Sequence, residues 1–98
     1  MLMSLRHTVV AGGRDNLVSG KYGSVVGGLN NYATAEGSLV AGGSQNVVQE
    51  IATYGSVLGG FNNVVAEYAA LIGAGQSNTA NGKFAAVIAG TDNVVSQE

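Results

Sequence analysis

The side chains of this 98-residue chain that could perform acid–base or metal chemistry are few and far apart. The single histidine, His7, occupies a repeat position that otherwise holds glycine or alanine, which indicates an end residue and not a catalytic base. Asp15 and Asp92 occupy equivalent positions five repeats apart, on the order of 24 Å at β-sheet spacing, so they cannot form a catalytic carboxylate pair. Only two repeats carry aspartate there and the chain has no cysteine, so we expect neither a calcium repeat nor a thiolate metal site. We expect a non-enzymatic protein without a cofactor or a metal ion.

Composition argues against further classes of partner. The net charge is -2 and the four basic residues are scattered, so no nucleic-acid-binding patch is expected. No apolar run approaches the roughly 18 residues of a membrane helix, and residues 1–6 are too short for a signal peptide. The Gly73–Gly75 stretch is an isolated GxG without the remaining glycines of a dinucleotide site. The last repeat stops at Glu98 without a polar cap, which favours a segment of a longer protein.

An asparagine recurs at a nearly constant interval and defines six repeats. The steps between successive asparagines are 15, 15, 17, 15 and 15 residues. A short fixed period is typical of a solenoid, in which each repeat forms one rung that packs on its neighbours. We expect residues 1–6 to be a lead-in and residues 7–98 to form a single repeat domain. The six asparagines are Asn16, Asn31, Asn46, Asn63, Asn78 and Asn93.

Each repeat predicts two short strands. Before the asparagine, a small residue precedes two aliphatic residues, and because neighbouring strand side chains point to opposite faces, both faces are expected to be buried. The first aliphatic column holds Val9, Val25, Leu39, Val57, Leu71 and Val87. The second, which we expect to form the core or the oligomer face, holds Val10, Val26, Val40, Leu58, Ile72 and Ile88. After the asparagine, the second residue is always valine or alanine, which predicts an inward position in a second strand.

Glycines and asparagines are expected to form the turns. Both residue types tolerate the left-handed backbone region, and stacked asparagine side chains can form a ladder of amides, so we assign the asparagines a structural role. The distance from small residue to asparagine alternates between 8 and 7 residues, which suggests double rungs at about 8–37, 38–69 and 70–98. The expected architecture is an all-β parallel solenoid, a flattened β-roll of about six 15-residue, two-strand rungs.

Two surfaces are candidates for a ligand. The longest connection, residues 46–54, contains Glu50, and loops of solenoids commonly carry binding residues. A second surface is a column of aromatic residues ahead of the first strand, which could present a glycan- or protein-binding platform or only shield the edge of the roll. The column holds Tyr22, Glu36, Tyr54, Tyr68 and Phe84, of which all but Glu36 are aromatic.

The second aliphatic column predicts self-association. Burial of six aliphatic side chains is worth on the order of 10–18 kcal/mol gross, and an exposed apolar strip would promote aggregation. Closed association about an axis along the stack, as a trimer or a dimer, would cover the strip. We expect a homotrimer that Val26→Asp or Ile72→Asp would dissociate.

The repeated Ser/Ala-Val-Val/Ile-x-Gly with a following Asn-x-Ala/Val, as in Ser24–Gly28 and Asn31–Ala33, resembles the YadA-like head repeats of trimeric autotransporter adhesins. Similar arrays are seen in phage tail fibres and viral spikes. The resemblance covers about 90 of the 98 residues. The resemblance implies a left-handed parallel β-roll, three chains side by side, and a location at a cell surface or in a virion as part of a longer protein. It also implies an exposed stalk that attaches to a host surface through a glycan or a protein.

Two other functions are compatible with the same architecture. A structural spacer in a fibre or virion would use the repeat only to set length. An ice-binding solenoid would present a regular array of threonines, but the threonines of this chain fall in different columns.

Overall fold

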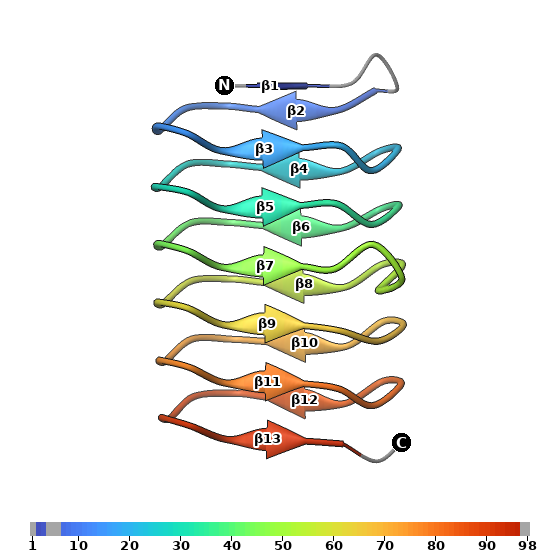
Figure 1. The fold of residues 1–98 in the computed structure, drawn as a ribbon, viewed down its shortest axis with the longest axis vertical. Coiled ribbons are helices and arrows are strands. Elements are labelled where there is room, and N and C mark those ends of the chain that lie inside the picture. Colours follow the sequence, from blue (N-terminus) through green and yellow to red (C-terminus); the bar gives the residue numbers. More distant parts are fainter. Residues whose placement is uncertain (1, 4–6, 97–98) are drawn as a thin grey trace.

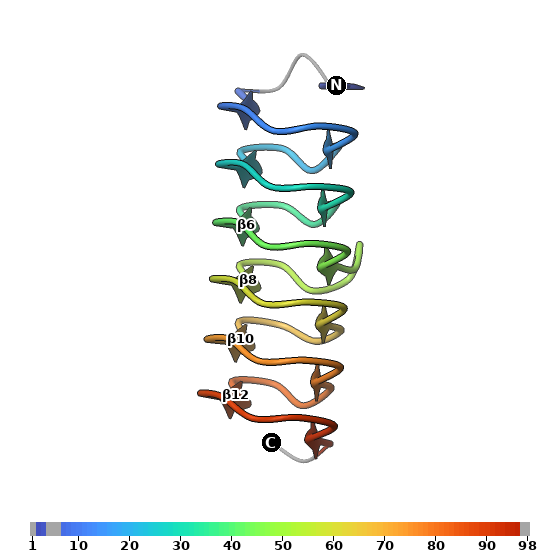
Figure 2. The ribbon, with the colours of Figure 1, turned by 90° about the vertical axis from the view of Figure 1, so that its left-hand side faces the viewer.

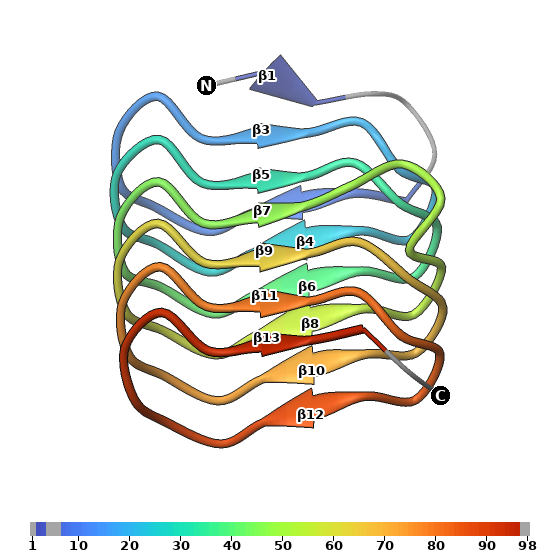
Figure 3. The same cartoon turned by 60° about the horizontal axis from the view of Figure 1, so that its bottom comes forward.

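The computed structural model describes residues 2–3 and 7–96, and within them the chain is an all-β parallel solenoid of about six turns without a helix. This confirms the predicted fold class. Short strands of two residues alternate between two parallel sheets, and β1 and β13 lie at opposite ends of the stack (Figure 1). The two sheets face each other across a thin interior (Figures 2 and 3).

The odd-numbered strands form a seven-stranded sheet and the even-numbered strands a six-stranded sheet. The seven-stranded sheet contains β1 (Leu2–Met3), β3 (Leu17–Val18), β5 (Tyr32–Ala33), β7 (Val47–Val48), β9 (Val64–Val65), β11 (Thr79–Ala80) and β13 (Val94–Val95). The six-stranded sheet contains β2 (Val9–Val10), β4 (Ser24–Val25), β6 (Leu39–Val40), β8 (Ser56–Val57), β10 (Leu71–Ile72) and β12 (Ala86–Val87). Rungs 1 to 6 are the successive pairs from β2 and β3 to β12 and β13.

Pairing in both sheets follows the step of the asparagines. Val25 pairs with Val40 and Val40 pairs with Val57, so the partners are 15 and then 17 residues apart. The alternation between 8 and 7 residues is therefore not a difference in pairing. In even rungs the small residue is itself the first strand residue, as Ser24 is in β4, whereas in odd rungs it precedes the strand, as Ser38 does. Odd and even rungs therefore pair in the same register, and the alternation does not define a structural double rung.

The core is a single layer of small and medium aliphatic side chains. One inward residue per strand is fully buried in the middle of the stack, including Val18, Ala33 and Val48 from one sheet and Val25 and Val40 from the other. This confirms the predicted inward column of valine and alanine after the asparagine. Small side chains are required because the molecule is only 13 Å across its shortest axis and 33 Å along its longest.

The six-residue lead-in joins the solenoid at least in part. Strand β1 pairs in parallel with β3, with Leu2 opposite Leu17, so the seven-stranded sheet begins before residue 7. The remaining lead-in residues 1 and 4–6, and residues 97–98 of the last predicted repeat, lie outside the described residues.

The asparagines form a ladder along one turn, but its rung-to-rung bonds run mainly from a backbone N–H to a side-chain oxygen and not, as expected, between stacked side-chain amides. The backbone N–H of Asn31 donates to Oδ1 of Asn16 at 2.9 Å, and its own Nδ2 donates to the carbonyls of Gly27 and Gly43 at 3.1 and 2.9 Å. The same pattern links Asn31 to Asn46 and continues to Asn93. Because the side chains of the first five asparagines are buried, the ladder satisfies turn backbone groups that water cannot reach.

Two columns of left-handed residues mark the two turns. The polar turn column, with φ between 56° and 61°, directly precedes the asparagines and holds Asp15, Asn30, Gln45, Asn62, Ser77 and Asp92. The aromatic turn column, with φ between 54° and 65°, precedes the strands of the six-stranded sheet and holds His7, Tyr22, Gly37, Tyr54, Ala69 and Phe84. Each column turns the chain at one edge of the roll and, except at Gly37, presents one side chain per rung.

The 17-residue step comes from the connection between β7 and β8. This connection is the larger loop on the right-hand side of Figure 1, at the edge formed by the aromatic turn column. Ala52 is buried there and its N–H donates to the carbonyl of Gln49 at 2.9 Å, while Glu50 and Ile51 are exposed. The two extra residues therefore bulge outward without disturbing the strands, as the sequence predicted for the longest connection.

Candidate assembly and binding surfaces

The outer face of the six-stranded sheet carries an uncovered apolar surface. Val26, Leu58 and Ile88 are 52, 49 and 72% exposed, and Val9 is 50% exposed. Leu39 and Leu71 also point outward and are partly exposed. We call this surface the aliphatic face. Its large residues are Val9, Val26, Leu39, Leu58, Leu71 and Ile88.

The structure divides the predicted second aliphatic column between the core and this face. Val40 and Ile72 are fully buried and Val10 packs against the core, whereas Val26, Leu58 and Ile88 are exposed. The six residues therefore do not form one column. When the repeats are aligned on their small residue, the strand positions of even rungs are shifted by one relative to those of odd rungs. In a strand, a shift of one position moves a side chain to the opposite face.

Large and small residues alternate on the aliphatic face. Each rung has two outward positions, the first strand residue and the residue two places later. The large residue is first in odd rungs and second in even rungs, so the large side chains follow a zigzag. The pairs are Val9 and Ala11, Ser24 and Val26, Leu39 and Ala41, Ser56 and Leu58, Leu71 and Gly73, and Ala86 and Ile88. None of these residues is charged.

Aromatic side chains line the edge formed by the aromatic turn column. The ring of Tyr54 makes an edge contact with Tyr68 at 5.9 Å, and Tyr68 makes another with Phe84 at 5.5 Å. The ring of His7 stacks on Tyr22 at 5.4 Å. Because the rings pack against one another across rungs, this edge favours the predicted shielding role over a flat stacking platform. Tyr68 belongs to the position before the aromatic turn column, whose own residue in that rung is Ala69.

The remaining residue of the predicted ligand surface, Glu50, lies exposed in the β7–β8 connection, four residues before Tyr54. The structure thus brings Tyr54, Tyr68 and Phe84 into one chain of ring contacts, with Tyr22 further along the same edge. The space above Gly37, in the rung between Tyr22 and Tyr54, is occupied by the Tyr54 ring, since a Cβ on Gly37 would lie 2.6 Å from its Cδ1.

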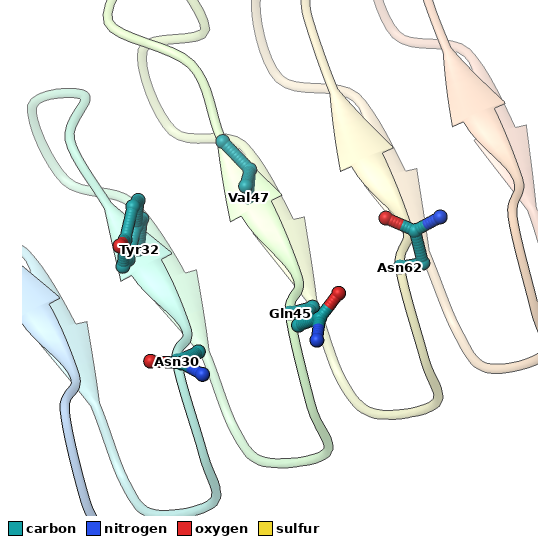
Figure 4. A pocket seen from close by; sticks show the side chains of 5 residues that line it. All are labelled: Asn30, Tyr32, Gln45, Val47 and Asn62. Atoms are coloured by element: carbon teal, nitrogen blue, oxygen red, sulfur yellow. The ribbon is translucent and has the colours of Figure 1, made fainter.

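A groove that the sequence did not single out lies on the outer side of the seven-stranded sheet. It has a volume of about 390 Å³ and is lined by Asn30, Gln45 and Asn62 of the polar turn column and by Tyr32 and Val47 of β5 and β7. Figure 4 shows the three carboxamides at corresponding positions of successive rungs, with Tyr32 and Val47 further along the same strands. This surface faces away from the aliphatic face.

Charged groups near these surfaces include Lys21, whose Nζ lies 5.2 Å from the centroid of the Tyr22 ring at the aromatic edge. Within residues 2–3 and 7–96, no group of three or more histidine, aspartate or glutamate side chains is placed to hold a metal ion. The ion pair between Arg14 Nε and Asp15 Oδ2 is 3.8 Å long and exposed at both ends. Asp92 lies in the last rung, at the other end of the polar turn column. The described part of the chain also contains no helix with the length and apolarity of a membrane span.

Neither a protein-family model nor a curated protein matches this chain. The class that the structure defines is an all-β parallel solenoid with an internal asparagine ladder, an uncovered aliphatic face and a polar groove on the opposite side.

Proposed function

We propose that this chain is a non-enzymatic attachment module that acts as a parallel homotrimer of left-handed rolls within a longer adhesin or fibre protein. The observation that carries the proposal is the aliphatic face, where all six rungs present a large apolar side chain to solvent in the single chain. A contiguous exposed apolar surface of this kind marks an interaction site.

The size of the aliphatic face supports association between copies. The two longer axes of the molecule measure 33 and 20 Å, and the strands run across this plane in Figure 1. The aliphatic face includes an outward apolar side chain from each of the six rungs, so it follows the long axis of the molecule and offers a continuous surface to another copy. The absence of charge on the face removes the desolvation and repulsion that two identical charged surfaces would meet.

The alternation of large and small residues favours copies that are parallel and at the same height. A rotation axis along the stack brings the first outward position of one copy near the second outward position of the next. At each height Leu39 of one copy then meets Ala41 of its neighbour, and Leu58 meets Ser56. A shift by one rung would instead bring large residues against large ones. This pairing of large with small residues at equal height is possible with two or three copies, and the resemblance to adhesin heads supports three.

Attachment and a spacer function make different predictions about binding. Labelled protein should bind a panel of cell surfaces and immobilised glycans, and the Leu58→Asp variant should bind more weakly because it loses the avidity of an oligomer. Ser19→Asp, on the outer side of the other sheet, is the matched control. An oligomer that binds no surface would support a spacer, and thermal hysteresis would instead support ice binding.

A further inference from the structure

We infer that the groove lined by Asn30, Tyr32, Gln45, Val47 and Asn62 is a binding site for an uncharged oligosaccharide that lies along the stack across rungs 2 to 4. The inference rests on the proposed attachment function and names its ligand class and its site. The groove lies on the opposite side of the roll from the aliphatic face, so it stays accessible when that face is covered by other copies.

The three carboxamides of the groove are free to bind a ligand. In the described part of the chain, the side chains of Asn30, Gln45 and Asn62 form no hydrogen bond with the protein. Their backbone N–H groups are already paired, to Arg14, Leu29 and Ser44 carbonyls at 3.0, 2.9 and 2.9 Å. The fold therefore fixes each Cα of the column and leaves one amide donor and one amide acceptor per rung for a ligand.

Backbone conformation alone does not account for these residue types. Asparagine is favoured at the left-handed φ of 56° and 61° seen at Asn30 and Asn62, but glutamine has no such preference at the φ of 57° seen at Gln45. What the three residues share is the carboxamide. In a column whose outer members are Asp15, Ser77 and Asp92, the run of three amides coincides with the groove.

The chemistry of the groove suits a carbohydrate. Amides spaced by about 4.8 Å, one per rung, offer a repeating donor and acceptor at about the length of one pyranose unit in an extended chain. Tyr32 is 40% exposed beside them and offers a ring on which the apolar face of a sugar can pack, with a hydroxyl at its edge. No charged residue lines the groove, so an ionic ligand would find no partner.

A peptide strand fits less well. Strands β5 and β7 pair on both sides within the sheet, so neither offers the free edge that β-strand addition needs. A peptide would have to bind through its side chains alone, whereas the hydroxyls of a glycan can pair with every amide of the column.

The test is a titration of the oligomer with cellohexaose, followed by NMR of isotope-labelled protein and by calorimetry, with chitohexaose and maltohexaose as neutral alternatives and sialyllactose as a charged one. We expect a neutral hexaose to shift the signals of residues 30–32, 45–47 and 62. Tyr32→Ala should weaken binding roughly tenfold and Gln45→Ala several-fold, while Tyr32→Phe should retain most of it. Ser77→Ala, in the same column outside the groove, should have no effect.

The failures of the two proposals are distinguishable. If no neutral hexaose binds, or if binding is lost in Tyr68→Ala and kept in Tyr32→Ala, the groove is not the site. Loss of binding in Tyr68→Ala alone would still be compatible with the proposed attachment function, with the ligand bound at the aromatic edge. Preferential binding of sialyllactose would also overturn the inference, because the groove has no cation to select it. A failure of self-association would appear separately, as the mass of a single chain in the same sample.

Discussion

Oδ1 of Asn46 accepts two hydrogen bonds from Asn63, one from its backbone N–H at 3.0 Å and one from its Nδ2 at 3.1 Å, across the one 17-residue step of the solenoid. Nδ2 of Asn46 donates to the carbonyls of Gly42 and Gly60, each at 3.0 Å. The backbone-to-side-chain bond of the ladder thus continues past the two inserted residues, and a bond between the two amides is added at this step. One side chain holds its own turn and the next rung together, so the register of the stack depends on it.

Replacing Asn46 with alanine should therefore destabilise the fold strongly. The substitution removes four hydrogen bonds and leaves the N–H of Asn63 buried without a partner, which costs about 2–4 kcal/mol. Asn93→Ala is the matched control, because Asn93 is exposed and, among the residues that the structure describes, its Nδ2 donates only to Ala89 at 3.3 Å. It should cost less than about 1 kcal/mol. Urea denaturation of both variants measures the difference, and equal losses would contradict a structural ladder.

Substitution of two adjacent glycines by alanine should change the free energy of unfolding by very different amounts. Gly28 has a φ of +97°, and an added Cβ would lie 2.2 Å from the carbonyl oxygen of Gly43, so Gly28→Ala should cost more than about 3 kcal/mol. Gly27 has open space at its Cβ position, and Gly27→Ala should stay within about 0.5 kcal/mol of the parent. Thermal unfolding of the two variants is the check. A stable Gly28→Ala variant would show that the rungs are further apart than described.

The variants Val26→Asp and Ile72→Asp should separate assembly from folding. The sequence pattern placed both residues in one column and predicted dissociation for each. Ile72 is fully buried, so an aspartate there puts an unpaired charge in the core and should unfold the chain. Val26 is 52% exposed, so Val26→Asp should give a folded chain of lower mass. Circular dichroism and light scattering on both variants test this, and a folded Ile72→Asp variant would refute the assignment of the core.

The unstaggered arrangement of copies predicts that exchanging large and small residues within a rung is tolerated. Ala41→Leu alone places a leucine opposite Leu39 of the neighbouring copy, and this overpacking should weaken association by about 1–3 kcal/mol per contact. Adding Leu39→Ala restores one large and one small residue at that height and should recover most of the loss. Sedimentation equilibrium of the single and double variants measures the coupling. Independent, additive effects would argue against this register.

The solenoid, its short strands and the asparagine ladder could be predicted from the sequence because a fixed period determines all three. The face of the sheet to which each strand residue points could not be predicted from the small residue of each repeat, because that residue occupies two different positions. Serine is compatible with a turn at Ser38, where its hydroxyl donates to the Ala35 carbonyl at 2.6 Å, and with an outward strand position at Ser24. If the repeats are instead aligned on their asparagines, Val40 and Val57 occupy the same inward position and Leu58 occupies an outward one.

The polar groove was not predicted, although its three carboxamides share a repeat position. Asn30, Gln45 and Asn62 each directly precede a ladder asparagine, which is a signal that the sequence contains. The sequence does not show that this position adopts a left-handed turn conformation or that it lines a groove with Tyr32 and Val47 of the adjacent strands. Those two facts depend on the backbone and on the stacking of the rungs.

The most direct test of the central claim is the absolute mass of the chain in solution, measured by light scattering behind a sizing column over a range of concentrations. Association through the aliphatic face predicts a constant mass near three times 9.8 kDa, falling to 9.8 kDa in Leu58→Asp and unchanged in Ser19→Asp. A parent chain that stays at 9.8 kDa at every concentration would contradict the account, because the aliphatic face would then be stable in water without a partner.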